Sequence, residues 1–336
     1  MSMRRWIKAL LISLIIFILT TLTILGLKIS QAINNPMIAQ GGKPVILEID
    51  KNSTALAFVY SLYRKDLISS PRIMLQLIRY KNYTSKLKAG IYQINPGESP
   101  NEFLDRVVAG DVLKQPFRII EGTTYAQVDE NLIKAPFLKY THDNWIANES
   151  PSSNPEGLLL ADTYIYEAGS SSKTMLQDAH KKLLQYLEQS WQNREPNLPY
   201  KSPYELLIAA SIIEKETGEP AEKRLIASVI VNRLNKHMPL QVDPTVIYAL
   251  GPNFSGKLSH GDMQIDSPYN TYRYRGLPPT PIAIVGKDAI DAAAHPASTQ
   301  YLYFVAKGDG THQFSTSYED QKRAINHYLR NNNGTK

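Results

Sequence analysis

The sequence predicts an α+β protein with an N-terminal transmembrane helix, a small β-α-α-β subdomain, and a larger, mainly helical domain that closes with a β-hairpin. Three observations lead to this fold class. An uncharged apolar run lies near the N-terminus, and a compact order of strand, helix, helix and strand follows it. A series of helices with apolar periodicity and clear start and stop residues comes next, and it ends in two short strands around a glycine turn.

The apolar run comprises the nineteen residues 9–27, and Arg4, Arg5 and Lys8 precede it. Its length suffices to span a bilayer. Basic residues flanking such a helix stay in the cytosol, so the rest of the chain is expected on the outer side of the membrane. A cleaved signal peptide is the alternative, but the run is long for one and no small-residue cleavage site follows closely. We therefore expect a retained anchor.

The segment 28–42 is polar and contains Pro36, Gly41 and Gly42, which predicts a linker. Behind it, the pattern of apolar and turn residues predicts four elements. They are a strand at 44–49, a helix capped by Asn52 or Ser53 that ends near Arg64, a helix from Ser70 to about Asn82, and a strand at 89–94. Ser99, Pro100 and Glu102 then form a capping-box pattern at the start of a short helix that Gly110 ends.

This order of elements resembles a LysM-like module, a fold often used to hold N-acetylated glycans. The alternative is a small packing domain with no ligand. Beyond it, residues 136–155 are rich in Ser, Asn and Pro and predict an extended surface loop. The remaining pattern predicts helices at 172–193, 202–218, 220–234, 243–251, 287–294 and 318–329, and strands at 301–306 and 313–315.

The helix from Pro203 carries the most informative chemistry. Ser202 can cap it, Glu205 completes a capping box, and Gly218 is the expected stop. The apolar stretch Leu206–Ile213 runs directly into Glu214, Lys215 and Glu216. This pattern places carboxyl groups at the end of a hydrophobic helix.

Helical geometry separates the two glutamates. At 100° per residue, Glu216 shares a face with Ala209, Ile212 and Ile213, whereas Glu214 points about 160° away. A carboxyl held against aliphatic neighbours loses hydration, and its pKa rises towards the range of a general acid. Glu216 is therefore the candidate acid. The alternative is that both glutamates are surface charges of the last turn.

Composition and motifs exclude several function classes. A net charge of +6 and a pI near 9.1 are modestly basic, and the basic residues form no dense run, so no nucleic-acid partner is expected. Zero cysteines exclude disulfides. The sequence has no H-E-x-x-H, P-loop, G-x-G-x-x-G or G-x-S-x-G motif. We expect no metal and no cofactor, which leaves carboxylate chemistry on a polymer outside the cytosol.

Two carboxylate mechanisms are open. An ordinary glycosidase needs a second carboxylate flanking the bond, which Asp243 or Glu222 could supply only if folding brings one of them close to Glu216. A transglycosylase manages with one: the acid protonates the leaving oxygen, and its carboxylate then removes a proton from the sugar's own hydroxyl, which attacks C1. Gln241 and Asp243 lie just before a helix, where they could bind a substrate, although capping explains Asp243 equally well.

Three long motifs resemble the endolytic murein transglycosylase family, also called YceG-like. They read IAASIIEKETGEPAEKRLIASVIVNRLNKHMPLQVDPTVIYALG, SPYNTYRYRGLPPTPIAIVGKDAIDAAAHPA and YLYFVAKGDGTHQFSTSYEDQ. The resemblance covers nearly the whole chain from the anchor to about Leu329. The family's catalytic glutamate is the second of its E-K-E-T motif, which is Glu216 here. One departure is that Ala161 stands in EGLLLADTY where the family usually has proline.

The resemblance implies a single-pass inner-membrane enzyme, a lyase whose LysM-like subdomain and catalytic domain lie in the periplasm. It would cut nascent peptidoglycan strands between N-acetylmuramic acid and N-acetylglucosamine, leave 1,6-anhydro ends and terminate glycan elongation. Peptidoglycan synthases (penicillin-binding proteins) are its implied protein partners. The positions of Asn232, Gln241, Asp243, Asn270 and Tyr272 within matching motifs suggest groups that bind glycan or orient Glu216.

The expected organisation follows from these elements. Its parts are a cytoplasmic N-terminus at 1–8, a transmembrane helix at 9–27, a linker at 28–42, a LysM-like subdomain at 43–115, a transglycosylase domain at 116–330 and a tail at 331–336. Two alternative functions stay open: a lysozyme-type peptidoglycan hydrolase that uses a second carboxylate, and a non-catalytic scaffold that binds the cell wall.

Overall fold

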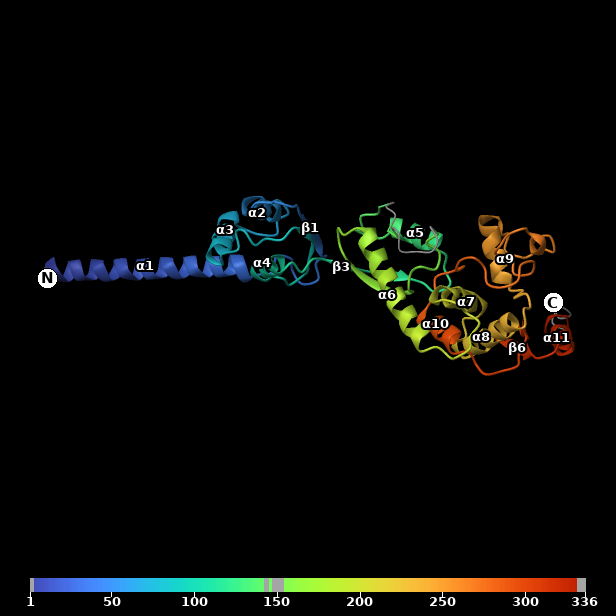
Figure 1. The fold of residues 1–336 in the computed structure, drawn as a ribbon. Helices are drawn as coiled ribbons and strands as arrows, with labels where there is room; N and C mark the ends of the chain where they lie inside the picture. The colour runs from blue at the N-terminus through green and yellow to red at the C-terminus, as the bar shows by residue number, and fades with distance from the viewer. Residues whose placement is uncertain (1–2, 142–144, 147–153, 331–336) are drawn as a thin grey trace. The chain divides into compact units, whose positions relative to one another are not determined.

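A computed structural model of the protein describes residues 3–141, 145–146 and 154–330. The chain forms two compact units (Figure 1). Unit 1 comprises Met1–Gln115 with Glu167–Gly169, and unit 2 comprises Pro116–Tyr166 with Ser170–Lys336. The expected tail at 331–336, and residues 142–144 and 147–153 of the expected surface loop, lie outside the described residues.

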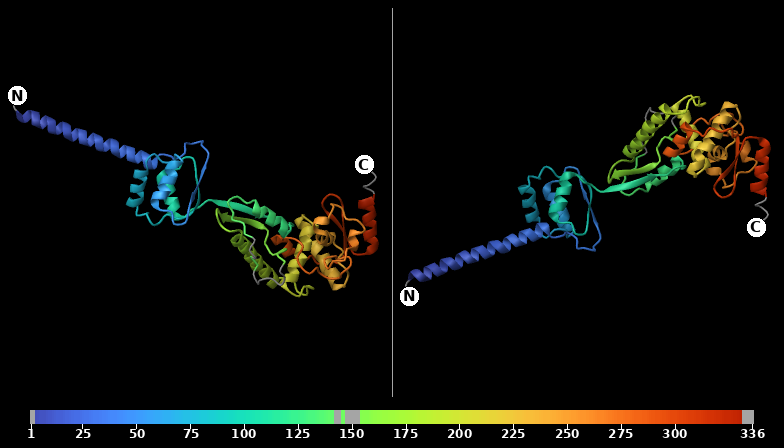
Figure 2. Two further views of the ribbon diagram at one scale, coloured as in Figure 1. Left: turned by 90° about the horizontal axis from the view of Figure 1, so that it is seen from above. Right: turned by 90° about the horizontal axis from the view of Figure 1, so that it is seen from below.

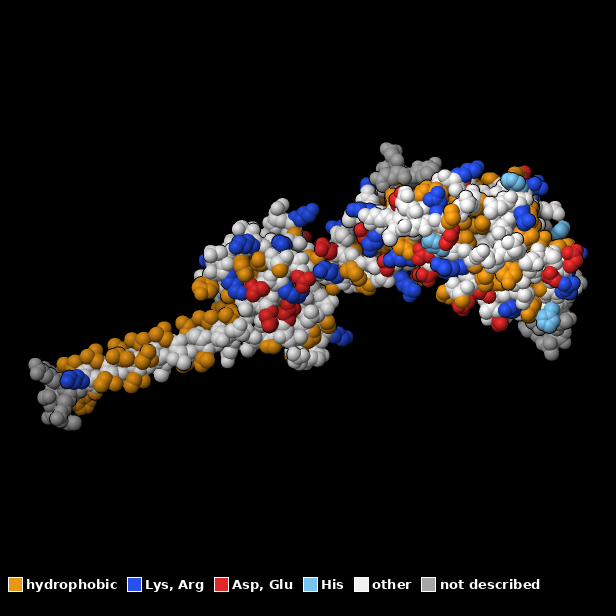
Figure 3. Space-filling view, turned by 60° about the horizontal axis from the view of Figure 1, so that its bottom comes forward, with side chains coloured by type: hydrophobic (Ala, Val, Ile, Leu, Met, Phe, Trp, Pro, Cys, Tyr) orange, Lys and Arg blue, Asp and Glu red, His pale blue; other side chains and the backbone are white. Residues whose placement is uncertain are grey.

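Unit 1 begins with the long helix α1 (Met3–Asn34). Its segment Trp6–Asn34 is long and apolar enough to cross a membrane, and Figure 3 shows hydrophobic side chains along its length. The helix does not end at Leu27, so the prediction of a linker from residue 28 is wrong for residues 28–34. The reason is local: neither glycine nor proline occurs there, and the first breaker is Pro36, which disfavours a helical conformation at Asn35.

A β-α-α-β arrangement follows, with a further helix behind it. The elements are β1 (Val45–Ile49), α2 (Ala55–Arg64), α3 (Pro71–Tyr80), β2 (Gly90–Ile94) and α4 (Pro100–Ala109). β1 and β2 pair antiparallel with Leu47 opposite Tyr92. Tyr92 packs edge-on against Phe103, and both rings are fully buried in a core that the two strands and three helices share. Figure 2 shows this unit from two further sides.

The caps of these helices agree with the sequence at two positions and differ at one. Ser70 caps α3, and Ser99 forms a complete capping box with Glu102 at α4. The predicted cap of α2 at Asn52 or Ser53 is wrong, because Thr54 accepts the hydrogen bond from the Ala57 amide at 3.1 Å. Asn52 instead lies in the preceding turn with a left-handed φ of 68°.

Unit 2 opens with a two-stranded sheet and two helices around it. The elements are β3 (Lys114–Ile119), α5 (Tyr125–Ile133), β4 (Asp162–Glu167) and α6 (Ser172–Gln192), with β3 paired to β4. The apolar stripe of α6 is buried, including Leu183 and Leu187. His180 is buried on the same helix, and its Nδ1 lies 2.7 Å from the Leu158 carbonyl oxygen, so it is a packed core residue.

The centre of unit 2 is α7 (Pro203–Glu216), in which every side chain of Leu206–Ile213 is buried. A helix that is hydrophobic on all sides must be covered on all sides. Neighbouring helices provide this cover. They are α6, α8 (Pro220–Asn235), α9 (Asp243–Leu250) and α10 (Lys287–Ala294).

The chain closes with a hairpin and a short helix. β5 (Tyr303–Ala306) pairs antiparallel with β6 (His312–Ser315), and α11 (Tyr318–Ile325) packs against both strands. The single helix predicted at 318–329 is wrong beyond Ile325, because the last described turn, η3 (Asn326–Arg330), is a π-helix. Two short 3-10 turns, η1 (Gly251–Asn253) and η2 (Asp262–Gln264), follow α9.

Candidate active site

The C-terminal turn of α7 presents the candidate acid. Ser202 caps the helix start at 3.2 Å from the Glu205 amide, but the capping box is incomplete, because Glu205 accepts from the Lys201 amide at 2.7 Å instead. The helix ends at Glu216 and not at Gly218 as predicted, since Thr217 already has an extended backbone. Glu216 is therefore the last helical residue, beside the point where the chain turns away.

Glu216 lies in a desolvating environment. Burial raises the pKa of its carboxyl to about 8, and the negative charge of Asp243 contributes further in the same direction. The residue as a whole keeps part of its surface exposed, while protein atoms surround the carboxyl. Within the described part of the chain, this carboxyl has no hydrogen bond and no ion pair. It is protonated at neutral pH and able to donate its proton.

Glu214 has the opposite environment although it lies only two residues earlier. Its Oε1 is 2.8 Å from Nζ of Lys223, and its Oε2 accepts from the Gly286 amide at 2.9 Å. Both side chains are almost fully buried, with 5% of Glu214 and 9% of Lys223 exposed. Glu214 therefore joins α7 to α8 and to the start of α10, and it has a structural role.

Asp243 and Tyr272 meet next to Glu216. The Tyr272 hydroxyl donates to Asp243 Oδ1 at 2.5 Å. Burial, this hydrogen bond, and the charges of Asp243 and Glu216 all raise the pKa of Tyr272. The capping interpretation of Asp243 is wrong, because Val242 is the N-cap of α9 and no side chain caps the helix. The fold thus brings three of the predicted site residues into one electrostatic cluster.

Arg233 supplies a cation near this cluster, and our sequence reasoning did not select it. Its charge lowers the pKa of Tyr272, although other effects there are larger. Its guanidinium is buried and donates to the carbonyl oxygens of Leu302 at 2.6 Å and Leu240 at 2.7 Å. The available signal was an arginine that follows the apolar stretch of this helix inside a matching motif.

Gln241 lies beside Arg233 and the tyrosine loop. Its Oε1 accepts from Arg233 Nη1 at 3.4 Å, and its amide donates to the Thr271 carbonyl oxygen at 3.1 Å. The backbone of Gln241 is left-handed, with a φ of 49°, and this strained conformation turns the chain into α9. Gln241 therefore connects the end of α8 to the segment that carries Tyr272.

Asn232 and Asn270 hold loops through backbone hydrogen bonds. The Asn232 amide group donates to the carbonyl oxygens of Thr299 at 3.0 Å and Tyr301 at 2.9 Å. Asn270 is fully buried, donates to the Met263 and Ile265 carbonyl oxygens, and accepts from the Tyr272 amide at 3.0 Å. Asn270 thereby sets the backbone position of Tyr272.

Glu222, the other proposed second carboxylate, is occupied elsewhere. Its Oε1 accepts from the His312 amide at 2.8 Å, and its Oε2 lies 2.7 Å from His312 Nδ1 on β6. The acidic side chain that raises the pKa of Glu216 is Asp243. In the described ranges, no group of three or more His, Asp or Glu side chains could hold a metal ion.

A second desolvated carboxyl, Glu156, was also missed. Burial raises its pKa to about 7, while hydrogen bonds from the Tyr125 and Gly157 amides and from Tyr248 act against this rise. Its Oε1 accepts from the Tyr125 amide at 2.9 Å, at the start of α5. Tyr248 belongs to α9, so Glu156 connects α5 with the helix that carries Asp243.

The departure at Ala161 has a structural counterpart. The Ala161 amide donates to the Val285 carbonyl oxygen at 2.9 Å, next to the bridge between Leu160 and Val285. A proline at this position has no amide hydrogen and cannot make this bond. The alanine thus adds one link to the segment that leads into α10.

Comparisons with known proteins agree on one family. Over 86% of each chain, this protein is 31% identical to the endolytic murein transglycosylase of Bacillus subtilis. It is 28% identical to the endolytic murein transglycosylase of Streptococcus pneumoniae, of which it spans 59%. A crystal structure of a YceG-like protein from Listeria monocytogenes matches with a TM-score of 0.50 and 28% identity, over 84% of this chain and 99% of that one. The sequence matches the YceG-like family over residues 47–327, and the chain therefore belongs to that family.

Proposed function

We propose that this protein is an endolytic murein transglycosylase, a lyase that cleaves the glycan strands of peptidoglycan. The observation that carries the proposal is the desolvated carboxyl of Glu216, whose pKa is raised to about 8 at the end of a buried helix. A group with this pKa keeps its proton at neutral pH, as a general acid must. The names of the curated relatives support the same activity.

The reaction needs two proton transfers at one group. Glu216 donates its proton to the glycosidic oxygen as the bond from C1 of N-acetylmuramic acid to N-acetylglucosamine breaks. The resulting carboxylate removes the proton of the C6 hydroxyl of the same muramic acid, whose oxygen attacks C1. A 1,6-anhydro end forms, Glu216 regains its proton, and no water is consumed. Internal cleavage of nascent strands in this way would terminate glycan elongation.

Asp243 and Tyr272 would stabilise the charge that develops during this reaction. Positive charge develops at C1 in an oxocarbenium-like transition state. The Asp243 carboxylate, oriented by the 2.5 Å hydrogen bond from Tyr272, supplies negative charge near Glu216. Gln241 belongs to the same surface through Arg233. We assign Asp243, Tyr272 and Gln241 to the glycan-facing wall, and Asn232 and Asn270 to holding the loops behind it.

A lysozyme-type hydrolase is the second candidate, because Asp243 is close enough to raise the pKa of Glu216. In that mechanism Asp243 would act as base or nucleophile. One oxygen of Asp243 is already bound by Tyr272, which favours an electrostatic role. The products distinguish the two mechanisms, since hydrolysis leaves reducing ends and transglycosylation leaves anhydro ends.

The location and the partners belong to the same proposal. We place α1 as a single-pass anchor in the cell inner membrane, with the N-terminus in the cytosol and both units on the periplasmic side. The β-α-α-β part of unit 1 would serve as a LysM-like module that holds glycan, and residues 116–330 would form the transglycosylase domain. Peptidoglycan synthases are the proposed protein partners, because they make the nascent strands that this enzyme would cut.

The decisive experiment is digestion of purified peptidoglycan glycan strands by the full-length protein in detergent, with products identified by mass spectrometry. We expect 1,6-anhydro-muramyl ends from internal cuts, and a loss of activity by a factor of about 10²–10⁴ in Glu216→Gln. Glu219→Gln is the matched control, because Glu219 is exposed and its side chain makes no cap. Ordinary reducing ends would assign the hydrolase mechanism instead. An unchanged cellular phenotype of Glu216→Gln would support a non-catalytic scaffold.

A further inference from the structure

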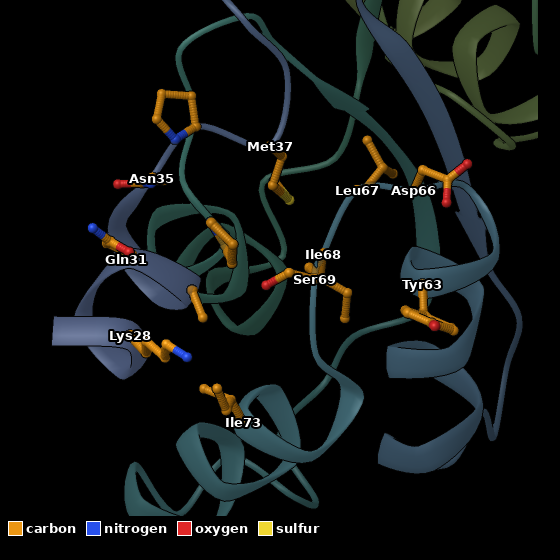
Figure 4. Close-up of a pocket in the computed structure, with 13 residues that line it drawn as sticks. Lys28, Gln31, Asn35, Met37, Tyr63, Asp66, Leu67, Ile68, Ser69 and Ile73 are labelled. Carbon is orange, nitrogen blue, oxygen red and sulfur yellow. The ribbon is translucent and has the colours of Figure 1, made fainter. Parts of the chain in front are cut away.

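The surface of unit 1 around the end of α1 has two hollows that the proposed reaction does not use. One is a groove of about 390 Å³ lined mainly by Ile29, Ile33, Ile73 and Leu77, between α1 and α3. The other is a mixed polar pocket of about 700 Å³ on the neighbouring face of α1. Figure 4 shows Lys28 and Gln31 of α1, with Asn35 just after it, on one side of this pocket, and Ser69 and Tyr63 on the other.

The height of these hollows above the proposed membrane follows from helix geometry. The uncharged segment 9–27 is about 28 Å long at 1.5 Å per residue, close to the thickness of about 30 Å of the hydrocarbon core. Ile29 and Ile33 therefore lie about 3 Å and about 9 Å beyond its end. The headgroup layer adds about 5–8 Å on each side, and any tilt of the helix brings these residues closer to it. The apolar groove is thus at headgroup height.

The exposed face of α3 has the composition of a helix at a membrane surface. Met74 and Ile78 face the core of unit 1, so the opposite face carries Arg72, Gln76 and Tyr80. Arg79 lies on that face as well. Tyr80 is 86% exposed. Tyrosine rings prefer the headgroup layer, and arginines bury their stems there while their charges contact lipid phosphates.

The position of α3 in unit 1 brings this helix close to the proposed membrane. Both views in Figure 2 place α3 on the side of the unit nearest the exposed length of α1. α1 is one uninterrupted helix from the apolar span to the groove, so unit 1 cannot turn independently of its anchor. The groove continues the apolar surface of α1 shown in Figure 3.

We propose that the α1–α3 groove, together with the exposed face of α3, is a lipid-binding surface that seats unit 1 in the headgroup layer of the outer leaflet. Acyl chains fill the apolar groove, while Arg72 and Arg79 contact anionic lipid phosphates. The inference rests on the proposed anchor and not on the catalytic proposal. Its consequence is that unit 1 is held at the membrane surface and does not swing on a flexible tether.

The natural absence of cysteine makes a direct test possible. Full-length single-cysteine variants carry a fluorophore at Leu19→Cys in the span, Gln76→Cys on α3, or Lys51→Cys in the exposed turn after β1. Figure 1 shows β1 and α3 on opposite sides of unit 1. They are reconstituted into phosphatidylglycerol-containing liposomes with spin-labelled lipids. We expect deep acyl-chain labels to quench the fluorophore at position 19, shallow labels to quench it at 76, and little quenching at 51.

Charge variants distinguish lipid binding from other causes of quenching at position 76. We expect Arg72→Glu with Arg79→Glu to reduce quenching at position 76 at least twofold, and Lys51→Glu to leave it unchanged. If the fluorophore is quenched at position 19 but is quenched no more strongly at 76 than at 51, the proposed lipid-binding surface is overturned and the anchor is retained. Protection of position 76 from both lipid labels and aqueous iodide would identify a protein occupant and also overturn it. No quenching at 19 would overturn the anchor and this inference together.

Discussion

Lys223 Nζ lies 2.8 Å from Glu214 Oε1. This buried ion pair gives Glu214 an environment that differs from that of Glu216 in the same helix turn. Glu214 is paired with Lys223 and accepts a hydrogen bond from the Gly286 amide. Glu216 makes no ion pair among the described residues, and burial raises its pKa to about 8. The ion pair thus engages the carboxyl of Glu214, whereas the carboxyl of Glu216 stays available for proton transfer.

The ion pair predicts a large effect of Lys223→Met on stability. Removal of the cation leaves the Glu214 charge buried without compensation, which typically costs about 3–5 kcal/mol. A lower midpoint of chemical unfolding in detergent measures this loss. Lys215→Met is the control, because Lys215 is exposed and its ammonium donates to the Gly122 carbonyl oxygen without a buried carboxylate as partner. The double variant Glu214→Gln/Lys223→Met should recover part of the loss; equal stability of the two single lysine variants would contradict the prediction.

The raised pKa of Glu216 predicts how stability and activity change with pH. The folded protein binds the Glu216 proton up to about pH 8, whereas the unfolded chain releases it near the ordinary value of 4.5. Stability contributed by this group therefore falls between about pH 4.5 and 8. Activity should fall above about pH 8, as the acid loses its proton.

Glu216→Gln is the test of this linkage, because glutamine has a similar shape and does not titrate. The free energy of unfolding of the variant, measured from pH 5 to 9, should decrease less with rising pH than that of the natural protein. Glu219→Gln should follow the natural protein. Parallel curves for Glu216→Gln and the natural protein would show that the Glu216 pKa is not raised.

The charge of Asp243 predicts how the alkaline limb of the pH–activity profile shifts when this charge is removed. Asp243→Asn removes a negative charge that raises the pKa of Glu216, so the pH at which activity falls should move to lower values. The measurement is the pH profile of kcat/KM on glycan strands. In the transglycosylase mechanism the variant keeps measurable activity and still forms anhydro ends. Complete loss of activity, equal to that of Glu216→Gln, would favour the hydrolase mechanism.

The hydrogen bonds of Asn270 predict that its substitution lowers both the stability and the activity of the protein. Asn270→Ala leaves the partly buried carbonyl oxygens of Met263 and Ile265 without these donors, at up to about 1–3 kcal/mol for each group left unsatisfied. It also removes the acceptor of the Tyr272 amide. We expect a lower thermal midpoint and weaker activity. Asn253→Ala, an exposed asparagine after α9, is the control; equal midpoints for the two variants would contradict the structural role.

Local patterns were sufficient for most elements. The helix at Lys287–Ala294 was predicted with its observed bounds, and the start of α7 at Ser202 and Pro203 was also correct. Such features depend on residues within one or two turns of each other, so their signal is complete in a short stretch. Some errors arose at ends, where the helix of α1 continued past Leu27 and α7 stopped before Gly218. Three elements, β3, α5 and β4, were not predicted at all.

The sequence by itself determined that the acidic turn Glu214–Glu216 follows a wholly apolar helix, and that its two glutamates face different ways. Periodicity encodes both facts. Tertiary structure alone decided their surroundings: Lys223 and Gly286 reach Glu214, whereas Asp243 affects Glu216 and is itself bound by Tyr272. A pKa depends on burial and on charges that folding brings together from distant parts of the chain, so no local pattern contains it.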